Sequence, residues 1–190
     1  IQVEEAGDRL SHDELLANTG LMYAAGFETT TNLIGNGLFA LLSHPDELQR
    51  LRADSSLMPS AIWELLRWDS PVQLNVRAAL RDVEILGESV GYGQIYTVLQ
   101  GSGNRDEAAY PVADGLDVGR FVDRSTPPPL SFGWGPHHCL GAALARAEGE
   151  IVFGGLLDRF ASLELLEAPS FRSSFTLRGL TSLNVACRSR

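Results

Sequence analysis

The sequence has few cysteines and no long hydrophobic run, and these absences exclude several classes of protein. Its 190 residues contain two cysteines, too few for a disulfide framework, so we expect a reducing, cytoplasmic location. No apolar stretch approaches 18 residues without polar groups, so we expect no transmembrane helix. Residues 1–5 lack the basic and apolar regions of a signal peptide, and the missing initiator methionine suggests a processed or excised piece.

Positive charge is also scarce. The chain has 15 Lys and Arg residues against 24 Asp and Glu, for a net charge of −9, so we expect neither nucleic acid nor an anionic membrane as a partner. Hydrophobic content of 44% and charged content of 21% are ordinary for a globular protein with one core.

Apolar periodicity predicts a long helix near the N-terminus. Ser11 and Glu14 form a capping-box pattern, and the apolar positions that follow predict a distal helix over about 11–43, roughly 48 Å long. Because this helix is apolar on more than one face, we expect it to run through the core. A second capping signal at Ser43 predicts short helices within about 45–68, which end before Pro71.

The remainder of the chain has a different pattern. Short strands are predicted within about 72–99 (Val72–Leu80, Val83–Leu86 and Gln94–Leu99), then a meander over about 101–129. A cysteine-containing loop and helix follow over about 130–160. Hairpins within about 162–187 would pair Ser162–Leu166 and Ser174–Leu177 with Leu183–Ala186. The fold class predicted is mainly α with a small β lobe (α+β), in a single partial domain over 1–190.

The most informative stretch is Phe-Gly-Trp-Gly-Pro-His-His-Cys-Leu-Gly over 132–141, which places Cys139 in a glycine-rich loop before a helix. Amide N–H groups and the helix dipole there favour a thiolate, which is either a nucleophile or a metal ligand. The alternative is a buried structural cysteine beside a turn. A zinc site is disfavoured although His137, His138 and Cys139 are contiguous, because no further ligand pair completes a tetrahedron.

The middle of the long predicted helix reads Ala-Ala-Gly-Phe-Glu-Thr-Thr over 24–30. Gly26 costs about 1 kcal/mol against alanine in a helix interior. Hydroxyls of Thr29 and Thr30 can bond to carbonyls one turn earlier, which predicts a local opening beside a buried Glu28. The alternative is a small-residue helix crossing with a salt-bridged glutamate.

The cysteine loop, with the Ala-x-x-Leu-Ala-Arg run that follows it, resembles the haem-binding loop of bacterial cytochromes P450. The resemblance implies the C-terminal half of that fold, with a long distal helix and a proximal helix after the cysteine loop, and haem b as cofactor. Cys139 would be the axial ligand of the haem iron. The other cofactor-binding residues that it implies in this loop are Phe132, Gly133, His137 at a propionate, Leu140 and Gly141.

The stretch around Gly26 is similar to the family's oxygen-activation motif, Ala-Gly-x-Glu/Asp-Thr. This similarity implies that Thr29 supplies a hydroxyl beside bound dioxygen and that Glu28 gates proton delivery, as catalytic residues. Ala25 and Gly26 would keep room over the iron. Dioxygen activation consumes protons at a site that is otherwise kept dry.

Further positions follow the family's order. Glu64 and Arg67 resemble its Glu-x-x-Arg pair, with Arg120 as the third member of a structural clamp, and Asn104-Arg105-Asp106 matches the loop before the meander. Arg77 resembles a propionate-binding strand arginine, although an ordinary edge-strand arginine is the alternative. Residues expected at the substrate pocket are Val72, Gln73, Leu74, Leu180 and Thr181.

The resemblance covers the chain but only half of a usual family member, and Pro127–Pro129 replace a histidine often found there. The other half normally covers the distal pocket, so the long helix would expose an apolar face that invites a partner.

Two functions are open. One is a monooxygenase fragment that uses dioxygen and two electrons, from ferredoxin and its reductase or from a flavoprotein, to hydroxylate or epoxidise an apolar small molecule. The other is a truncated, silent haem-binding or interaction module that needs a complementary N-terminal half.

Overall fold

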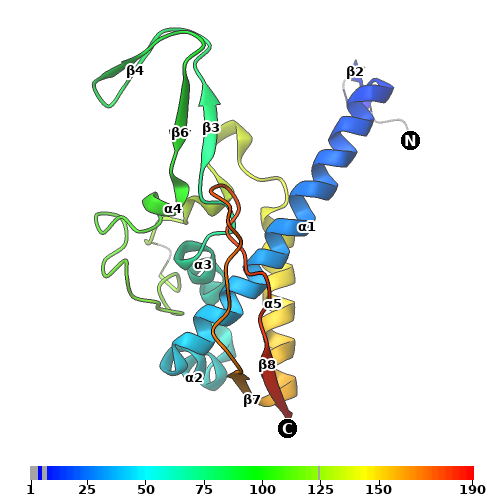
Figure 1. The fold of residues 1–190 in the computed structure, drawn as a ribbon, viewed down its shortest axis with the longest axis vertical. Helices are drawn as coiled ribbons and strands as arrows, with labels where there is room; N and C mark the ends of the chain where they lie inside the picture. The colour runs from blue at the N-terminus through cyan, green and yellow to red at the C-terminus, as the bar shows by residue number, and fades with distance from the viewer. Residues whose placement is uncertain (1–3, 6–7, 124) are drawn as a thin grey trace.

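The computed structural model describes residues 4–5, 8–123 and 125–190, which form a helical core with small two-stranded sheets around it (Figure 1). Residues 1–3, which bear on the expectation about a signal peptide, lie outside the described residues, as does residue 124 of the predicted meander. The helices are α1 (His12–Ser43), α2 (Pro45–Ala53), η1 (Ser55–Leu57), α3 (Met58–Trp68), α4 (Gln100–Gly103), η2 (Leu130–Phe132), η3 (Gly135–His137) and α5 (Ala142–Arg159). The strands are β1 (Glu4–Glu5), β2 (Asp8–Arg9), β3 (Asn75–Ala78), β4 (Val83–Ile85), β5 (Glu88–Val90), β6 (Ile95–Val98), β7 (Phe160–Leu165) and β8 (Val185–Ser189).

A capping box starts α1, as the sequence predicts. The Ser11 backbone N–H donates to Glu14 Oε2 at 2.8 Å, and the Glu14 N–H donates to Ser11 Oγ at 3.2 Å. The next helix, α2, is capped differently: its N-cap residue is His44, without a side-chain cap bond, so the capping signal predicted at Ser43 is wrong. Pro45 at the first position of α2 leaves no N–H to satisfy there.

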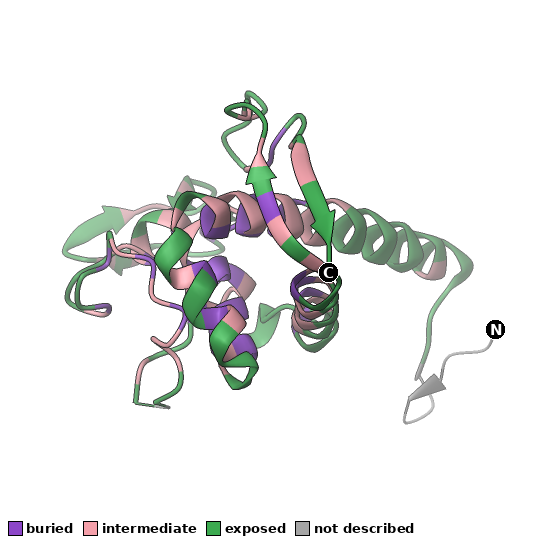
Figure 2. Cartoon of the chain, turned by 90° about the horizontal axis from the view of Figure 1, so that it is seen from below, coloured by how far each residue is buried: buried purple, intermediate pink, exposed green. Residues whose placement is uncertain are grey.

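The core lies where the C-terminal half of α1 meets α3 and α5. Gly37 allows this approach, because a Cβ there would lie 2.8 Å from Phe153 Cζ and 3.0 Å from Leu65 Cδ1. Burial in Figure 2 is concentrated in this region. The core residues are Leu33, Ala40, Leu41, Leu48, Leu51, Met58, Ala61, Ile62, Leu65, Leu66, Leu116, Val118, Phe153, Leu157 and Leu163.

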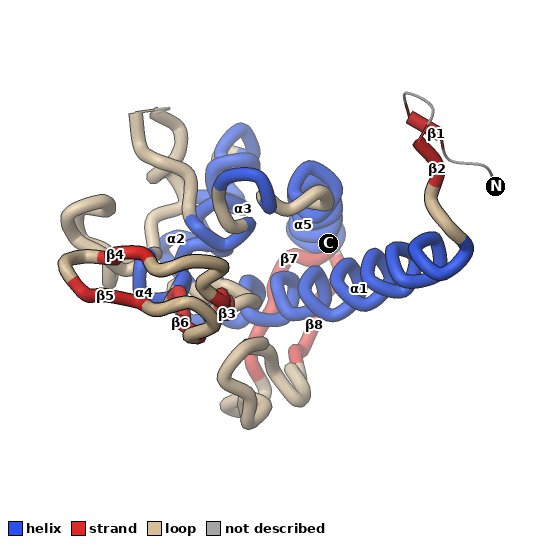
Figure 3. The backbone as a smooth tube through the Cα atoms, turned by 90° about the horizontal axis from the view of Figure 1, so that it is seen from above, coloured by secondary structure: helices blue, strands red, loops and turns tan. Residues whose placement is uncertain are grey.

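The N-terminal half of α1 projects away from this core (Figures 1 and 3). Its large apolar side chains are exposed: Leu16, Leu21, Met22, Tyr23 and Phe27. The expectation from periodicity that the whole helix runs through the core is therefore wrong, since buried residues begin only at Asn32. The exposed apolar face expected from the half-length resemblance is confirmed. The sequence pattern shows which face of a helix is apolar, but that face is buried only if another element packs against it. None of the described elements covers this half.

Two antiparallel pairs form the sheet lobe, β3 with β6 and β4 with β5. The strand predicted over Val83–Leu86 ends at Ile85, because Leu86 and Gly87 form the turn of the hairpin with φ of +52° and +84°. Two central residues with positive φ are typical of a tight hairpin turn. The sequence missed β5, since a leucine is an unusual residue for such a turn.

The structure corrects the predicted pairing of the C-terminal tail in one respect. β7 pairs with β8, close to the predicted pairing, with Leu165 opposite Val185. Ser174–Leu177, predicted as a strand of the same hairpins, instead runs along residues 71–73, where Gln73 N donates to Thr176 O at 2.9 Å and Arg178 N donates to Pro71 O at 2.8 Å. The tail is thereby tied to the segment after α3.

Candidate functional site

Two 3₁₀ turns and the start of α5 shape the loop that carries Cys139. Gly133 and Gly135 have φ of +71° and +79°, in the left-handed region that favours glycine. The Cys139 N–H donates to Phe132 O at 2.9 Å, which closes the loop on itself, and Ala142 N donates to Cys139 O at 3.3 Å. The backbone thus holds the cysteine just before α5.

The Cys139 thiol is free and exposed, which contradicts the alternative of a buried structural cysteine. Its sequence neighbours Trp134, Leu140 and Leu144 are also exposed, with Leu140 at 91%. Phe132 anchors the loop to α3, because its half-buried ring packs edge-on against Trp63 with 5.8 Å between ring centroids. Exposed apolar side chains therefore flank the cysteine in sequence. Gly141 keeps it open on one side, since a Cβ there would lie 3.8 Å from Cys139 Sγ.

Metal ligands are sparse around this thiol. His137 and His138 are exposed, and within the described residues no group of three or more His, Cys, Asp or Glu side chains could hold a metal ion. A single cysteine that no such group accompanies does not suit a bare ion such as zinc. It suits a planar cofactor that brings its own ligands for the metal and takes one axial ligand from the protein. The residues present fit haem b in this respect.

Arg77 lies on β3, opposite Tyr96 of β6, with an exposed side chain. Its Nη1 donates only to the neighbouring carbonyl of Val76, at 3.0 Å, and no ion pair involves it within the part of the chain described. Most of the guanidinium donors therefore have no protein partner within the described residues. Figure 1 shows the base of β3, the middle of α1 and the loop before α5 at the same height along the molecule.

The predicted opening of α1 near residues 24–30 is wrong, because the helix is continuous from His12 to Ser43. Thr29 Oγ1 donates to Ala25 O at 2.5 Å, as predicted, but the second back-bonding hydroxyl belongs to Thr31, which donates to Phe27 O at 2.8 Å. Both bonds add to the helical ladder without replacing it. Ala25 and Gly26 are exposed, and a Cβ on Gly26 would meet nothing within 4 Å.

Glu28 is less buried than the sequence suggests, with 42% of its side chain exposed. Its Oε1 lies 2.8 Å from Nη1 of Arg172, which comes from the C-terminal tail. The salt bridge of the alternative interpretation is thus present, whereas the small-residue helix crossing at Gly26 is not. Glu28 and Thr29 stand next to one another at the border between the exposed and buried halves of α1.

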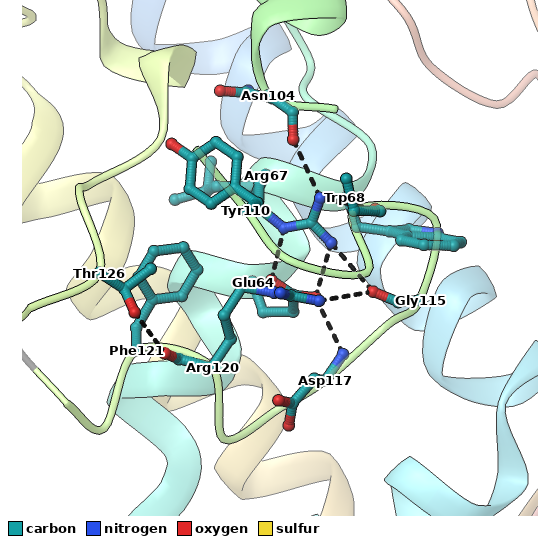
Figure 4. Close-up of polar contacts among 12 residues, drawn as sticks. Glu64, Arg67, Trp68, Asn104, Tyr110, Gly115, Asp117, Arg120, Phe121 and Thr126 are labelled. Carbon is teal, nitrogen blue, oxygen red and sulfur yellow. Dashed lines mark hydrogen bonds and ion pairs between the residues drawn. The ribbon is translucent and has the colours of Figure 1, made fainter. Parts of the chain in front are cut away.

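The structure brings Glu64, Arg67 and Arg120 together in one buried cluster (Figure 4). Arg67 Nε and Nη2 donate to the two carboxylate oxygens of Glu64 at 2.7 and 2.8 Å, and both side chains are 0% exposed. Arg120 Nε donates to Glu64 Oε2 at 3.0 Å. A bidentate pair of this kind is geometrically specific as well as strong.

The same cluster holds the meander by its backbone. Arg67 donates to the carbonyls of Asn104, Ala113 and Gly115, at 2.9, 2.8 and 3.1 Å. Arg120 donates to the carbonyls of Pro111, Val112 and Gly115, at 2.7, 3.2 and 2.9 Å, and Asp117 N donates to Glu64 Oε1 at 2.9 Å. These bonds fix a segment that has little regular structure of its own.

Sequence reasoning missed four polar residues between this clamp and the cysteine loop: Asn75, Gln100, Asn104 and Ser131. Asn104 was noted only as part of a matching triplet. Three of them, Gln100, Asn104 and Ser131, are buried. Buried amides and hydroxyls in an otherwise irregular stretch are the signal that could have found them, but burial of a loop cannot be inferred from its sequence.

The five expected pocket residues are dispersed. Leu180 is buried near Gly35, Val72 is bridged to Leu177, Leu74 is half-buried, and Thr181 is exposed with Oγ1 donating to Ser170 O at 3.0 Å. Only Gln73 among them lines a pocket of about 400 Å³. That pocket lies between the C-terminal end of α1 and the end of α3, and Asp69, Arg105 and Arg178 give it a charged lining. Cys139 does not line it, so it is separate from the cysteine loop.

Comparison with known proteins identifies the architecture. A family model for cytochrome P450 matches residues 1–177. A putative cytochrome P450 133B2 from Xylella fastidiosa is 44% identical over 96% of this chain and 45% of that protein. The polyketide-synthase cytochrome P450 PksS of Bacillus subtilis superposes with a TM-score of 0.91 at 40% identity, over 98% of this chain and 48% of that one. P450BioI, solved with a hexadec-9Z-enoic acid ligated acyl carrier protein, gives a TM-score of 0.90 at 38% identity, over 96% and 47%.

The predicted fold class, the C-terminal half of the cytochrome P450 fold, is confirmed by these superpositions. The chain spans about half the length of the relatives that it matches. None of the described helices has both the length and the apolar character needed to cross a lipid bilayer.

Proposed function

The chain belongs to the cytochrome P450 family, and from that membership we propose that it carries the haem-thiolate site of a monooxygenase that hydroxylates or epoxidises an apolar small molecule. Members of the family are haem-thiolate enzymes that bind haem b. The observation that carries the proposal is the exposed Cys139 thiol, held by its own loop just before α5, with the exposed apolar residue Leu140 next to it in sequence. The relatives named for polyketide synthesis and for a fatty acyl chain on a carrier protein support an apolar substrate.

In this proposal each side chain has one task. Cys139 would bind the haem iron through Sγ, with Phe132, Gly133, Leu140, Gly141 and Ala25 against the cofactor. Arg77 and His137 would hold its propionates. When bound, the haem would supply the binding and activation of dioxygen, which no protein side chain can supply. Electrons would come from ferredoxin and its reductase or from a flavoprotein.

Proton handling falls to the middle of α1. Thr29 would present its hydroxyl beside the dioxygen site. The hydroxyl donates to Ala25 O, so its oxygen can accept a hydrogen bond from a proton-bearing group, and turning away from Ala25 O would free its own proton for donation toward dioxygen. Glu28 would exchange protons with solvent, to which it is partly open, and pass them toward Thr29.

The unpaired state of both cysteines supports a reducing location such as the cytoplasm.

The reduced carbon-monoxide difference spectrum of the haem-loaded protein tests this proposal. We expect the signature of thiolate ligation in the unmodified protein and in Cys187→Ser, and its loss in Cys139→Ser. Cys187 is the matched control, because it is also a free and exposed cysteine. A spectrum typical of a neutral ligand in the unmodified protein would contradict the proposal.

A second candidate is favoured by the exposed apolar half of α1: a module that binds haem only together with a complementary polypeptide. Co-expression with the N-terminal half of the Xylella fastidiosa relative separates the two. Haem uptake by the chain alone supports the first candidate, and uptake only in the presence of the added half supports the second.

A further inference from the structure

Asn104, directly after α4, connects the clamp to the cysteine loop. The residue is fully buried, and its backbone carbonyl accepts a bond from Arg67 Nη1 at 2.9 Å. Its side chain reaches in the other direction, where Oδ1 accepts from Leu130 N at 2.7 Å and Nδ2 donates to Ser131 Oγ at 3.0 Å. Ser131 Oγ in turn donates to Leu66 O at 2.7 Å. The first residues of the cysteine loop are therefore bonded to α3 both directly, from Ser131, and by way of Asn104.

Gln100 makes a second connection, from the same loop to β3. Its Nε2 donates to Leu130 O at 2.8 Å, and its Oε1 accepts from Asn75 Nδ2 at 2.6 Å. Asn75 is the first residue of β3 and shares a face of the strand with Arg77, two residues on. Leu130 thus has its N–H bonded to Asn104 and its carbonyl bonded to Gln100.

The four side chains of this network, Asn75, Gln100, Asn104 and Ser131, are called the loop anchor below. The loop anchor links two elements that share no other hydrogen bond within the described residues. One is the turn Leu130–Phe132, whose last carbonyl accepts from Cys139 N. The other is β3, which carries Arg77.

We propose that the loop anchor positions the cysteine loop against β3, so that Cys139 and Arg77 meet one cofactor at a fixed separation. This inference rests on the proposed function, because it assumes that both residues hold the same haem. Polar side chains suit this role better than apolar packing, because hydrogen bonds at both ends of an amide fix direction as well as distance.

A merely structural network makes a different prediction from a positioning one. Asn75→Ala removes only the link from Gln100 to β3 and leaves both bonds to Leu130 in place. If the loop anchor only stabilises the fold, this half-buried, peripheral change leaves haem retention unaltered. If it sets the separation of Cys139 and Arg77, haem retention falls although the cysteine loop keeps its protection.

The test has one measurement without haem and one with it. Hydrogen exchange at the Cys139 amide reports on the loop in the haem-free protein. We expect it to be about ten-fold faster in Gln100→Ala and Asn104→Ala, because a hydrogen bond from a buried residue to the loop is lost in each, and unchanged in Asn75→Ala. Asn36→Ala is the matched control, since Asn36 is equally buried and its Nδ2 donates to Arg178 O at 3.0 Å, away from the cysteine loop.

The second measurement is the rate at which haem transfers from the loaded protein to excess apo-globin. We expect a several-fold faster transfer in Asn75→Ala, Gln100→Ala and Asn104→Ala, and no change in Asn36→Ala. Unaltered transfer in Asn75→Ala would overturn the positioning role. Absence of haem uptake by the unmodified protein would instead contradict the proposed function, and unaltered Cys139 exchange in Gln100→Ala and Asn104→Ala would contradict the loop anchor on its own.

Discussion

Glu28 on α1 and Arg172 in the C-terminal tail are ion-paired, with 2.8 Å between Oε1 and Nη1, although 144 residues separate them in sequence. The pair stands beside other contacts of the tail with α1. Phe171 packs edge-on against Phe39 with 6.1 Å between ring centroids, and Asn36 Nδ2 donates to Arg178 O. The tail therefore lies against the stretch of α1 that is proposed to handle protons.

Exchanging the two charges of this pair should preserve the contact, whereas either single change should loosen the tail. Because both side chains are about half exposed, the pair stabilises the docked tail by at most about 1 kcal/mol. Amide exchange over residues 170–181 should accordingly be up to about five-fold faster in Glu28→Arg and in Arg172→Glu than in the unmodified protein. In the double variant the exchange rate should return to that of the unmodified protein. Arg188→Glu provides the same charge change elsewhere in the tail and should have no effect. Failure of the double variant to recover would show that the pair does not dock the tail.

Removing the acid of the clamp should cost far more than removing an exposed acid. Glu64→Gln leaves the Arg67 guanidinium buried without its counter-ion, which typically costs about 3–5 kcal/mol in the free energy of unfolding. Glu164→Gln, on the exposed face of β7, should change the free energy of unfolding by less than about 0.5 kcal/mol. Urea unfolding of both variants is the measurement. Similar midpoints would mean that the clamp does not hold the meander.

Local sequence was sufficient for those parts of the fold whose geometry is set by a few adjacent residues. The capping box at Ser11, the Glu-x-x-Arg pair at one helical turn, and the glycines that turn the cysteine loop are all of this kind. The pairing of Glu64 with Arg120 was expected only by resemblance, because nothing local indicates which arginine reaches a buried acid 56 residues away.

The sequence was insufficient where burial depends on a neighbour. Apolar side chains such as Leu21 and Phe27 are typical of a core helix, yet they are exposed because no described element covers them. Ser174–Leu177 reads as a hairpin strand, but Leu177 bridges to Val72, a partner too distant to be read from the tail alone. The loop anchor was missed for the same reason, since Gln100 and Asn104 are polar residues whose burial depends on the packing of α4 under Leu130.

Two glycines of α1 should respond oppositely to alanine. Gly37→Ala places a methyl group 2.8 Å from Phe153 Cζ inside the core. We therefore expect the free energy of unfolding to fall by about 1–3 kcal/mol, despite the gain in helix propensity. A Cβ added at Gly20 would have no neighbour within 4 Å, so Gly20→Ala should raise the free energy of unfolding by up to about 1 kcal/mol. Thermal unfolding of both variants measures the contrast. Stabilisation by Gly37→Ala would mean that α1 does not approach α5 this closely.

Asp69 should make the fold less stable as the pH rises from about 3.8. Burial raises the pKa of its carboxyl, and this effect outweighs the opposing effect of Arg178, whose side chain is 40% exposed and therefore screened. An acid with a higher pKa in the folded than in the unfolded chain stabilises the fold fully below its ordinary value of 3.8 and loses that contribution as the pH rises through the folded value.

The variant Asp69→Asn does not titrate and serves as the reference for this effect. The free energy of unfolding of the unmodified protein, minus that of the variant, should fall as the pH rises from about 3.8. Denaturant unfolding at a series of pH values measures the difference. A difference that grows with pH would show that the bond from Arg178 Nε to Asp69 Oδ1 dominates over burial.

Thr29 and Thr31 allow the proton-handling role to be separated from the helix. Both hydroxyls donate to the carbonyl four residues earlier, so replacement of either by alanine changes α1 in the same way. Only Thr29 is placed beside dioxygen in the proposed site, so Thr29→Ala should release more hydrogen peroxide per electron pair at the expense of product, while Thr31→Ala should keep the coupling of the unmodified protein. Peroxide and product are measured together against consumption of the electron donor, in the haem-loaded protein with its redox partner. Equal uncoupling in both variants would point to a helix effect, and unchanged coupling in Thr29→Ala would remove Thr29 from the proton path.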